Sequence, residues 1–304
     1  MLDQVLKGDV LAAAKLIRGI EDELPEAVAE LEDVYLHSGR AYIVGLTGAP
    51  GAGKSTLLGC LIGAFRKRDV KVGVVAIDPT SPFSGGALLG DRIRMQSHGA
   101  DKEVFIRSLA SRGWKGGLSR AASNTIHIMD AMGKDVIFVE TVGSGQGEVD
   151  IAGVADTSLV VLVPGMGDEI QMMKAGIMEV ADIFVINKAD REGAESLRMS
   201  LETMPGVKSG QQIVLTEAIH DKGTGELAEA ILKHKAFLVS SGELEKRRRE
   251  RARVELTMAV ESALRKHLET TDECYLDDLV DDLVQRKTSP GAAAQKVINL
   301  PKQP

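Results

Sequence analysis

The chain has 304 residues, 44% of them hydrophobic, and a net charge of −7 at pH 7. This length and composition are typical of a folded globular protein with one large domain or a domain with extensions, and the acidic balance argues against a general nucleic-acid binder, which would normally carry a basic face. No apolar run approaches the ~20 residues of a membrane span and the N-terminal segment lacks a signal-peptide core, so we expect a cytoplasmic protein without a nucleic-acid or membrane partner.

Residues 1–40 are predicted to form a helical extension. Apolar residues recur at helical spacing from Leu2 to His37. Asp9 is expected to cap a helix, and Pro25 stands where a further helix could begin. The acidic stretch from Ile20 to Glu32 is typical of a solvated helix face.

Residues 41–240 alternate short β-rich runs with amphipathic segments. Such alternation predicts an α/β domain with a mostly parallel sheet that is covered by helices on both faces. Because functional residues of this architecture gather at the carboxyl ends of the strands, polar motifs are expected to follow them. The predicted strands are Ile43–Thr47, Val70–Ile77, Val104–Arg107, Val136–Glu140, Ser158–Val163, Ile183–Asn187 and Ile213–Thr216.

The motif G-x-x-x-x-G-K-[ST] follows the first of these strands. Its glycines would allow backbone N–H groups to surround phosphate oxygens at the start of the next helix, which is expected over Thr56–Arg68. Lys54 is expected to reach the β- and γ-phosphates and to act in catalysis, and Ser55 to bind Mg²⁺. The residues predicted to bind the nucleotide here are Gly48, Ala49, Pro50, Gly51, Ala52, Gly53, Lys54, Ser55 and Thr56.

Three acidic residues are further ligands for the predicted magnesium shell. Asp78 follows the second strand, Asp91 lies further along the same connection, and Glu140 ends the strand Val136–Glu140. Carboxylate oxygens suit this cation, and the length of the Glu140 side chain suggests contact through a water molecule. Glu140 is also expected to act in catalysis. Asp78 is the stronger of the two aspartates because of its position at a strand end, whereas Asp91 could simply cap or pair with Arg92 or Arg94.

Two loops are predicted to respond to the state of the nucleotide. In the first, the Gly143 amide could sense the γ-phosphate, and Gln146 could orient the attacking water as a catalytic residue, with an ordinary loop amide as an equal alternative. The second loop begins at Pro164. None of these positions is a base poised for strong catalysis, so slow intrinsic hydrolysis with acceleration by a partner is expected. The residues expected to couple the nucleotide to a partner are Gly143, Asp168, Gln171 and Lys174.

A guanine-reading element of the form N-K-x-D ends the strand Ile183–Asn187. A carboxylate at Asp190 can accept hydrogen bonds from the ring N1–H and the exocyclic amine of guanine, which adenine cannot supply together. The element therefore indicates GTP rather than ATP. A second base-contacting loop is expected at the end of the last strand, where backbone N–H groups near Ala218 could donate to guanine O6. The residues predicted to contact the base are Asn187, Lys188, Asp190, Glu217, Ala218 and Ile219.

Residues 241–304 are predicted to form a helical arm. The mixed-charge run Glu243–Arg253 is typical of a solvated helix surface. Apolar residues at helical spacing within and after this run need a covering surface, which a second copy of the chain would supply. These apolar residues are Leu244, Val254, Leu256, Met258, Val260 and Leu264.

Together these motifs closely resemble the MeaB family of P-loop GTPases, from the N-terminal helices to the tail. The family includes the human methylmalonic aciduria type A protein and bacterial proteins named ArgK or lysine-arginine-ornithine transport kinase. The resemblance implies a homodimeric GTPase that gates the delivery of adenosylcobalamin to a cobalamin-dependent acyl-CoA mutase, such as methylmalonyl-CoA mutase, and that protects or reactivates this enzyme. GTP, GDP and Mg²⁺ are the implied cofactors, and the cobalamin adenosyltransferase is a further implied partner.

The resemblance also assigns roles to matching residues. It implies that the loop from Pro164 faces the mutase and that the tail contributes to dimerisation. One departure concerns Glu217, which stands where many relatives have a small hydroxyl residue, so only the backbone part of that base contact is expected. The residues implied around the phosphates and Mg²⁺ are Lys54, Ser55, Asp78, Asp91 and Glu140, and those implied in coupling are Asp168 and Lys174.

Two other functions stay open on the sequence. A nickel-insertion GTPase of the same fold would usually bring clusters of His or Cys ligands, whereas the 6 histidines are scattered and Cys60 lies far from Cys274. The same spacing predicts neither a disulfide framework nor a cysteine zinc site. A kinase that phosphorylates a transport protein would need an acceptor site, and the sequence identifies none.

Overall fold

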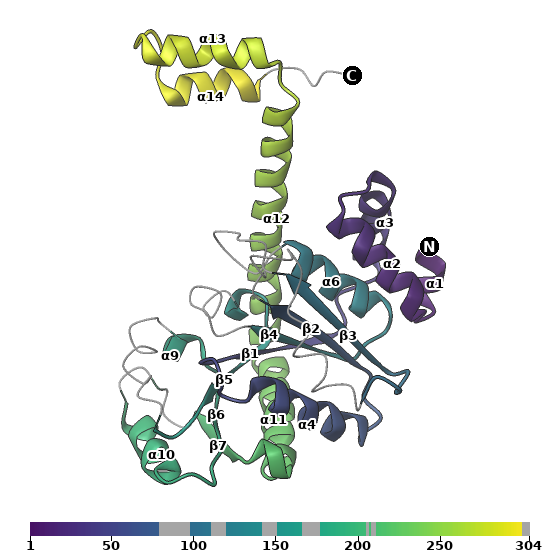
Figure 1. The fold of residues 1–304 in the computed structure, drawn as a ribbon, viewed down its shortest axis with the longest axis vertical. Coiled ribbons are helices and arrows are strands. Elements are labelled where there is room, and N and C mark those ends of the chain that lie inside the picture. The colour runs from purple at the N-terminus through teal and green to yellow at the C-terminus, as the bar shows by residue number, and fades with distance from the viewer. Residues whose placement is uncertain are drawn as a thin grey trace. The chain divides into compact units, whose positions relative to one another are not determined.

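The computed structural model describes residues 1–78, 98–110, 120–141, 151–165, 177–204, 207 and 211–299. The chain forms two compact units, Met1–Arg248 and Arg249–Pro304. A sheet with helices makes up the first unit, and helices make up the described part of the second (Figure 1).

A seven-stranded sheet in the order β3-β2-β4-β1-β5-β6-β7 forms the middle of the first unit. All neighbouring strands are parallel. Four of the strands are buried along their whole length, as a sheet covered on both faces requires. The strands are β1 (Tyr42–Thr47), β2 (Val72–Asp78), β3 (Val104–Ala110), β4 (Val136–Thr141), β5 (Thr157–Leu162), β6 (Ile183–Asn187) and β7 (Gln212–Thr216). The predicted α/β fold and its seven strands are confirmed, with small shifts at the strand ends.

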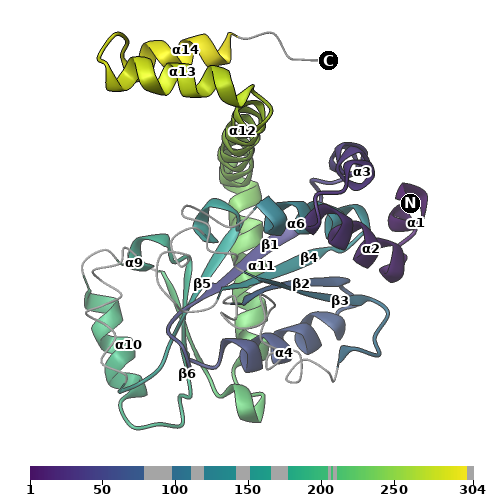
Figure 2. The ribbon, with the colours of Figure 1, turned by 45° about the horizontal axis from the view of Figure 1, so that its top comes forward.

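Helices cover both faces of this sheet (Figure 2). The helices of the first unit are α1 (Leu2–Leu6), α2 (Val10–Glu21), α3 (Pro25–Leu36), α4 (Lys54–Arg66), α6 (Arg120–Ala131), α9 (Ile177–Val180), α10 (Ala194–Thr203) and α11 (Thr224–Ser241). Leu159 and Val161 of β5 share a core with α4 and α11. Val160 and Leu162 point to the opposite face and share a core with α10. The period-two alternation of an apolar strand thus places one half of its side chains in each layer.

The N-terminal helices share a core with α6 and with the sheet. The Asp9 side chain accepts hydrogen bonds from the N–H groups of Leu11 and Ala12, at 2.8 and 3.0 Å, and so caps α2. Pro25 is the first residue of α3, where its missing N–H costs no helix hydrogen bond. Both predicted helix starts are confirmed.

The second unit contains most of α12 (Glu243–Glu269) and all of α13 (Glu273–Val284) and α14 (Pro290–Ile298). The last two helices lie side by side around Leu279, Ala293 and Val297 (Figures 1 and 2). The predicted helical tail is confirmed, whereas its role in dimerisation and the domain boundaries at 40 and 240 stay predictions. Within the described ranges, no helix combines the length and the apolar content that a membrane crossing needs.

Candidate nucleotide site

The loop between β1 and α4 has a conformation that only glycine adopts readily. Gly48 has a φ of 140° and Gly53 a φ of 86°. A Cβ atom on Gly48 would lie 2.2 Å from the carbonyl oxygen of Val161, and one on Gly53 would lie 2.5 Å from Asn187 Nδ2. Both distances are shorter than real Cβ contacts, so the glycines of the motif are required by the close approach of the loop to β5 and β6.

The first turn of α4 has no side-chain cap among the described residues. Its N-cap residue is Gly53. The first N–H groups of a helix need acceptors, and the helix dipole places positive charge at the same end. Phosphate oxygens satisfy both requirements. The local structure therefore fits the phosphate-binding role that the motif predicts.

Lys54 and Ser55 are buried at the start of α4, with 7% and 6% of their surfaces exposed. Lys54 Nζ donates hydrogen bonds to the carbonyl oxygens of Gly48 and Ala49, at 2.6 and 3.1 Å. Ser55 Oγ donates to Glu140 Oε1 at the end of β4, at 2.7 Å. The ammonium thus lies against the phosphate loop, and a hydroxyl and a carboxylate, both of them oxygen donors that suit Mg²⁺, lie beside each other.

Asn187 joins the phosphate loop to the second base loop. Its side chain is buried, and Nδ2 donates to the carbonyl oxygen of Ala52 at 2.8 Å. Its Oδ1 accepts from the Thr216 hydroxyl and from the Ala218 N–H, both at 3.2 Å. The Ala218 N–H, which the sequence predicts as a donor to the base, therefore donates to Asn187 in this structure.

Lys188 and Asp190 complete the element at the end of β6. Lys188 has a left-handed φ of 55°, and its Nζ donates to the carbonyl oxygen of Gly51 at 2.8 Å. Asp190 is exposed. The element therefore contacts the phosphate loop twice, through Asn187 and Lys188, and leaves Asp190 exposed.

Charged side chains within the second base loop contact one another. Glu217 Oε2 accepts a hydrogen bond from Lys222 Nζ at 3.0 Å and lies 3.2 Å from His220 Nδ1. The hydrogen bond from Lys222 lowers the pKa of Glu217 below its ordinary value. Ile219 is 79% exposed. The Glu217 side chain is thus held within its own loop, and the backbone contact to the base stays a prediction.

Cys60 and Gly223 lie beside the second base loop but were not predicted. Cys60 Sγ donates to the carbonyl oxygen of Ala218 at 3.1 Å, and burial raises the pKa of this thiol and keeps it protonated. A Cβ atom on Gly223, whose φ is 74°, would lie 2.1 Å from the carbonyl oxygen of Leu215. The glycine before a predicted helix was a usable signal, whereas no motif marks Cys60, because only the packing of α4 brings it to the loop.

Several predicted site residues cannot be placed by their side chains. Asp78 is the last residue of β2 and so stands at the same sheet edge as the motifs above, but its side chain is outside the described part of the chain. Among the described side chains, no group of three or more His, Cys, Asp or Glu residues is arranged to hold a metal ion. The predicted residues that lie outside the described ranges are Asp91, Gly143, Gln146, Asp168, Gln171 and Lys174.

A family comparison gives the class to which this site belongs. The family model described as "Methylmalonyl Co-A mutase-associated GTPase MeaB" matches residues 13–273. The chain belongs to the MeaB family. The resemblance seen in the sequence is confirmed, and MeaB membership makes the chain a nucleotide-binding GTPase of the P-loop class.

Individual relatives agree with the MeaB assignment. A protein of Pyrococcus horikoshii named as a GTPase is 47% identical over 306 residues, which cover 98% of this chain and 96% of the relative. GTPase ArgK of Escherichia coli is 34% identical, over 82% of this chain and 79% of its own. A fused isobutyryl-CoA mutase of Geobacillus kaustophilus is 38% identical over 66% of this chain and 19% of its own. A crystal structure described as LAO/AO transport system kinase shares the fold, with a TM-score of 0.70 and 24% identity over 97% of this chain and 94% of its own.

Proposed function

We propose that this MeaB-family chain is a guanine-nucleotide switch that serves a cobalamin-dependent acyl-CoA mutase. The observation that carries the nucleotide part of the proposal is the Asn187 side chain, which bonds to Ala52 of the phosphate loop and to Ala218 of the base loop. Phosphate and base recognition are therefore parts of one buried hydrogen-bonded unit. Such a unit suits a protein that must hold the whole nucleotide and respond to its state.

Guanine specificity is assigned to the exposed Asp190 carboxylate. Isothermal titration calorimetry should show GTP and GDP binding at least 100-fold more tightly than ATP, because two hydrogen bonds to a charged acceptor contribute about 3 kcal/mol or more. Asp190→Asn is the matched variant, since xanthine carries a carbonyl where guanine carries its exocyclic amine. This variant should lose affinity for GTP and gain affinity for XTP. Equal affinities of the parent protein for GTP and ATP would contradict the assignment.

We assign the acceleration of GTP hydrolysis to the neutralisation of phosphate charge rather than to a strong general base. Lys54 would bind the β- and γ-phosphates, and Ser55 and Glu140 would hold Mg²⁺, which neutralises phosphate charge. The local fit supports this, since the Ser55 hydroxyl and the Glu140 carboxylate are 2.7 Å apart. Roles for Asp78 and Asp91 at the metal and for Gln146 at the attacking water are part of the same proposal.

The partner is proposed to be a mutase whose adenosylcobalamin loading and protection this chain controls. The family description and the relative that contains isobutyryl-CoA mutase support a mutase link. The coupling residues would be those predicted on the two loops, Gly143, Asp168, Gln171 and Lys174. GTP hydrolysis measured with purified methylmalonyl-CoA or isobutyryl-CoA mutase, with and without adenosylcobalamin, should rise at least tenfold, about 1.4 kcal/mol in the barrier. Lys54→Ala is the control, and a rate that no such mutase changes would contradict the proposal.

A homodimer through the helical arm is proposed on the apolar residues of α12. Leu256, Val260, Leu264 and Leu268 recur every four residues, and between 40% and 65% of each is exposed. Residues at this spacing lie along one side of a helix. A second copy of the same helix would cover them, which agrees with the dimerisation role implied for the family.

A further inference from the structure

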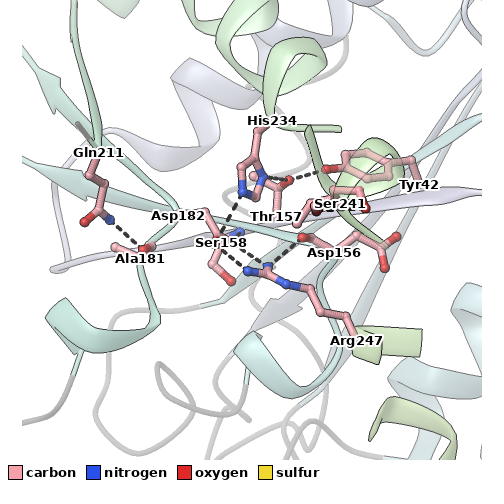
Figure 3. Close-up of polar contacts among 11 residues, drawn as sticks. Tyr42, Asp156, Thr157, Ser158, Ala181, Asp182, Gln211, His234, Ser241 and Arg247 are labelled. Atoms are coloured by element: carbon pink, nitrogen blue, oxygen red, sulfur yellow. Dashed lines mark hydrogen bonds and ion pairs between the residues drawn. The ribbon is translucent and has the colours of Figure 1, made fainter. Parts of the chain in front are cut away.

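A polar network lies where β5 and β6 begin (Figure 3). Because the strands are parallel, this is the sheet edge opposite the nucleotide loops, which follow the strand ends. Its centre is Asp182, whose side chain is 8% exposed. The carboxylate accepts a hydrogen bond from the Ser158 N–H at 2.9 Å and one from each terminal nitrogen of Arg247, both at 2.7 Å. Arg247 Nη1 also donates to the carbonyl oxygen of Asp156, at 2.7 Å. Arg247 thus holds the two segments that lead into β5 and β6.

The network continues through His234 of α11 to the start of β1 (Figure 3). A hydrogen bond of 2.7 Å joins His234 Nδ1 to the Thr157 hydroxyl, which is hydrogen-bonded to the Tyr42 hydroxyl. A hydroxyl, an imidazole and a carboxylate therefore follow one another as in a hydrolase. The Thr157 side chain is fully buried, however, and His234 Nε2 is 3.6 Å from Asp182 Oδ1, too far for a hydrogen bond. The arrangement is therefore not a catalytic triad.

The neighbouring residue Arg248 reaches a third strand. It donates to the carbonyl oxygens of Gly39 and Ala41, at 2.9 and 3.4 Å, just before β1. Arg247 and Arg248 lie in the mixed-charge run that the sequence predicts to be solvated; both are partly exposed, but they also donate to acceptors on the sheet. Their acceptors are far away in sequence, so a charge pattern cannot reveal them. With the buried Leu244, the two arginines attach the first turns of α12 to the sheet.

A break in the helix precedes this attachment. α11 ends at Ser241, and Gly242 has a left-handed φ of 74° before α12 begins at Glu243. Because a glycine allows other backbone angles, the first turns of α12 depend on the contacts of Leu244, Arg247 and Arg248 to stay on the sheet. Most of these contacts are polar. A bidentate guanidinium–carboxylate pair is strong only while both of its hydrogen bonds keep their geometry.

The strands that begin at these contacts end at the nucleotide loops. β1 leads to the phosphate loop, β5 to the loop from Pro164, and β6 to Asn187 and Asp190, and the three strands are neighbours in the sheet. We propose that Asp182, Arg247 and Arg248 form a clamp through which the nucleotide controls the direction of α12. In one nucleotide state the clamp is closed, and in the other a small shift between the strands opens it. This inference rests on the proposed nucleotide function and adds to it the route to the helical arm.

Distances between spin labels test the clamp directly. The labels are attached to cysteines that replace Lys67 in α4 and Ala259 in α12, in a chain that carries Cys60→Ser and Cys274→Ser and is diluted with unlabelled chain. Pulsed electron resonance is recorded without nucleotide, with GDP and with a non-hydrolysable GTP analogue. We expect distance distributions that differ between the two nucleotides. Arg247→Lys, which keeps the charge but loses the two-pronged geometry, should give one broad distribution in every state.

A second variant and a binding measurement make the outcome unambiguous. Asp182→Asn should broaden the distribution as Arg247→Lys does, and Arg253→Lys, which alters an exposed ion pair with Glu250 on the same helix, should behave as the parent chain. Because coupling is reciprocal, Arg247→Lys should also change the ratio of GDP to GTP-analogue affinity by about fivefold in calorimetry. Identical distributions with both nucleotides in a parent chain that binds them would overturn the clamp alone. A parent chain that binds neither nucleotide would contradict the proposed function, and the clamp with it.

Discussion

Replacement of Asn187 by alanine should destabilise the nucleotide-free protein. The lost amide bonds to the Ala52 carbonyl, the Thr216 hydroxyl and the Ala218 N–H, and these three residues are 1%, 1% and 5% exposed. Water cannot easily replace the amide at such buried partners. Since one hydrogen bond contributes about 1 kcal/mol to stability, the free energy of unfolding should fall by about 3 kcal/mol.

Urea unfolding followed by circular dichroism measures this loss. For a dependence of about 1–3 kcal/mol per molar urea, the unfolding midpoint should move down by about 1–3 M. Asp190→Ala is the matched control, because Asp190 lies three residues further on and is exposed. Its unfolding free energy should stay within about 0.5 kcal/mol of the parent value, while its preference for guanine is lost.

Two results would refute the reasoning. An unchanged midpoint for Asn187→Ala would show that the amide does not join the two loops. An equal loss of stability in Asp190→Ala would show that any change at the end of β6 has this effect, whatever side chain is removed.

Three further predictions concern other parts of the chain. Gly53→Ala should weaken nucleotide binding at least tenfold in calorimetry, because its Cβ would lie 2.5 Å from Asn187 Nδ2, while Gly225→Ala, whose Cβ meets no described atom within 4 Å, should not. Lys222→Ala should raise the pKa of Glu217 in a carbon-13 titration, because the hydrogen bond from Lys222 lowers that pKa. The ion pair stabilises the fold at pH values above the ordinary carboxyl pKa, and this stabilisation is lost as the pH falls through the lowered pKa. An unmoved titration curve would contradict the pairing. Removal of residues 249–304 should halve the number of chains per particle in light scattering, and an unchanged number would reject the arm as the dimer contact.

The fold could be predicted because most of its strands are recognisable from their own residues. β1, β4, β5 and β6 are almost continuous apolar runs, which only a sheet covered on both faces can bury. The glycines and lysine of the phosphate loop and the Asn187 element are short motifs whose chemistry is local. Their common position at one sheet edge then follows from parallel strands.

The rest of the site depends on contacts between distant segments. Cys60 is 158 residues from Ala218, and Arg247 is 65 residues from Asp182, and neither pair shares a local pattern. The sequence identifies Asn187 as part of a base-reading motif, but its bonds to two loops become visible only when the strands are side by side. A mixed-charge run likewise does not reveal which of its arginines meets a buried carboxylate.

The contact between Gly53 and Asn187 couples two positions that are far apart in the chain. A side chain at 53 would occupy the space of the amide at 187, so each residue restricts what the other can be. Shortening position 187, for example to serine, would remove this clash but not the strain of a side chain at a φ of 86°, and a double-mutant cycle of the two positions should show non-additive free energies.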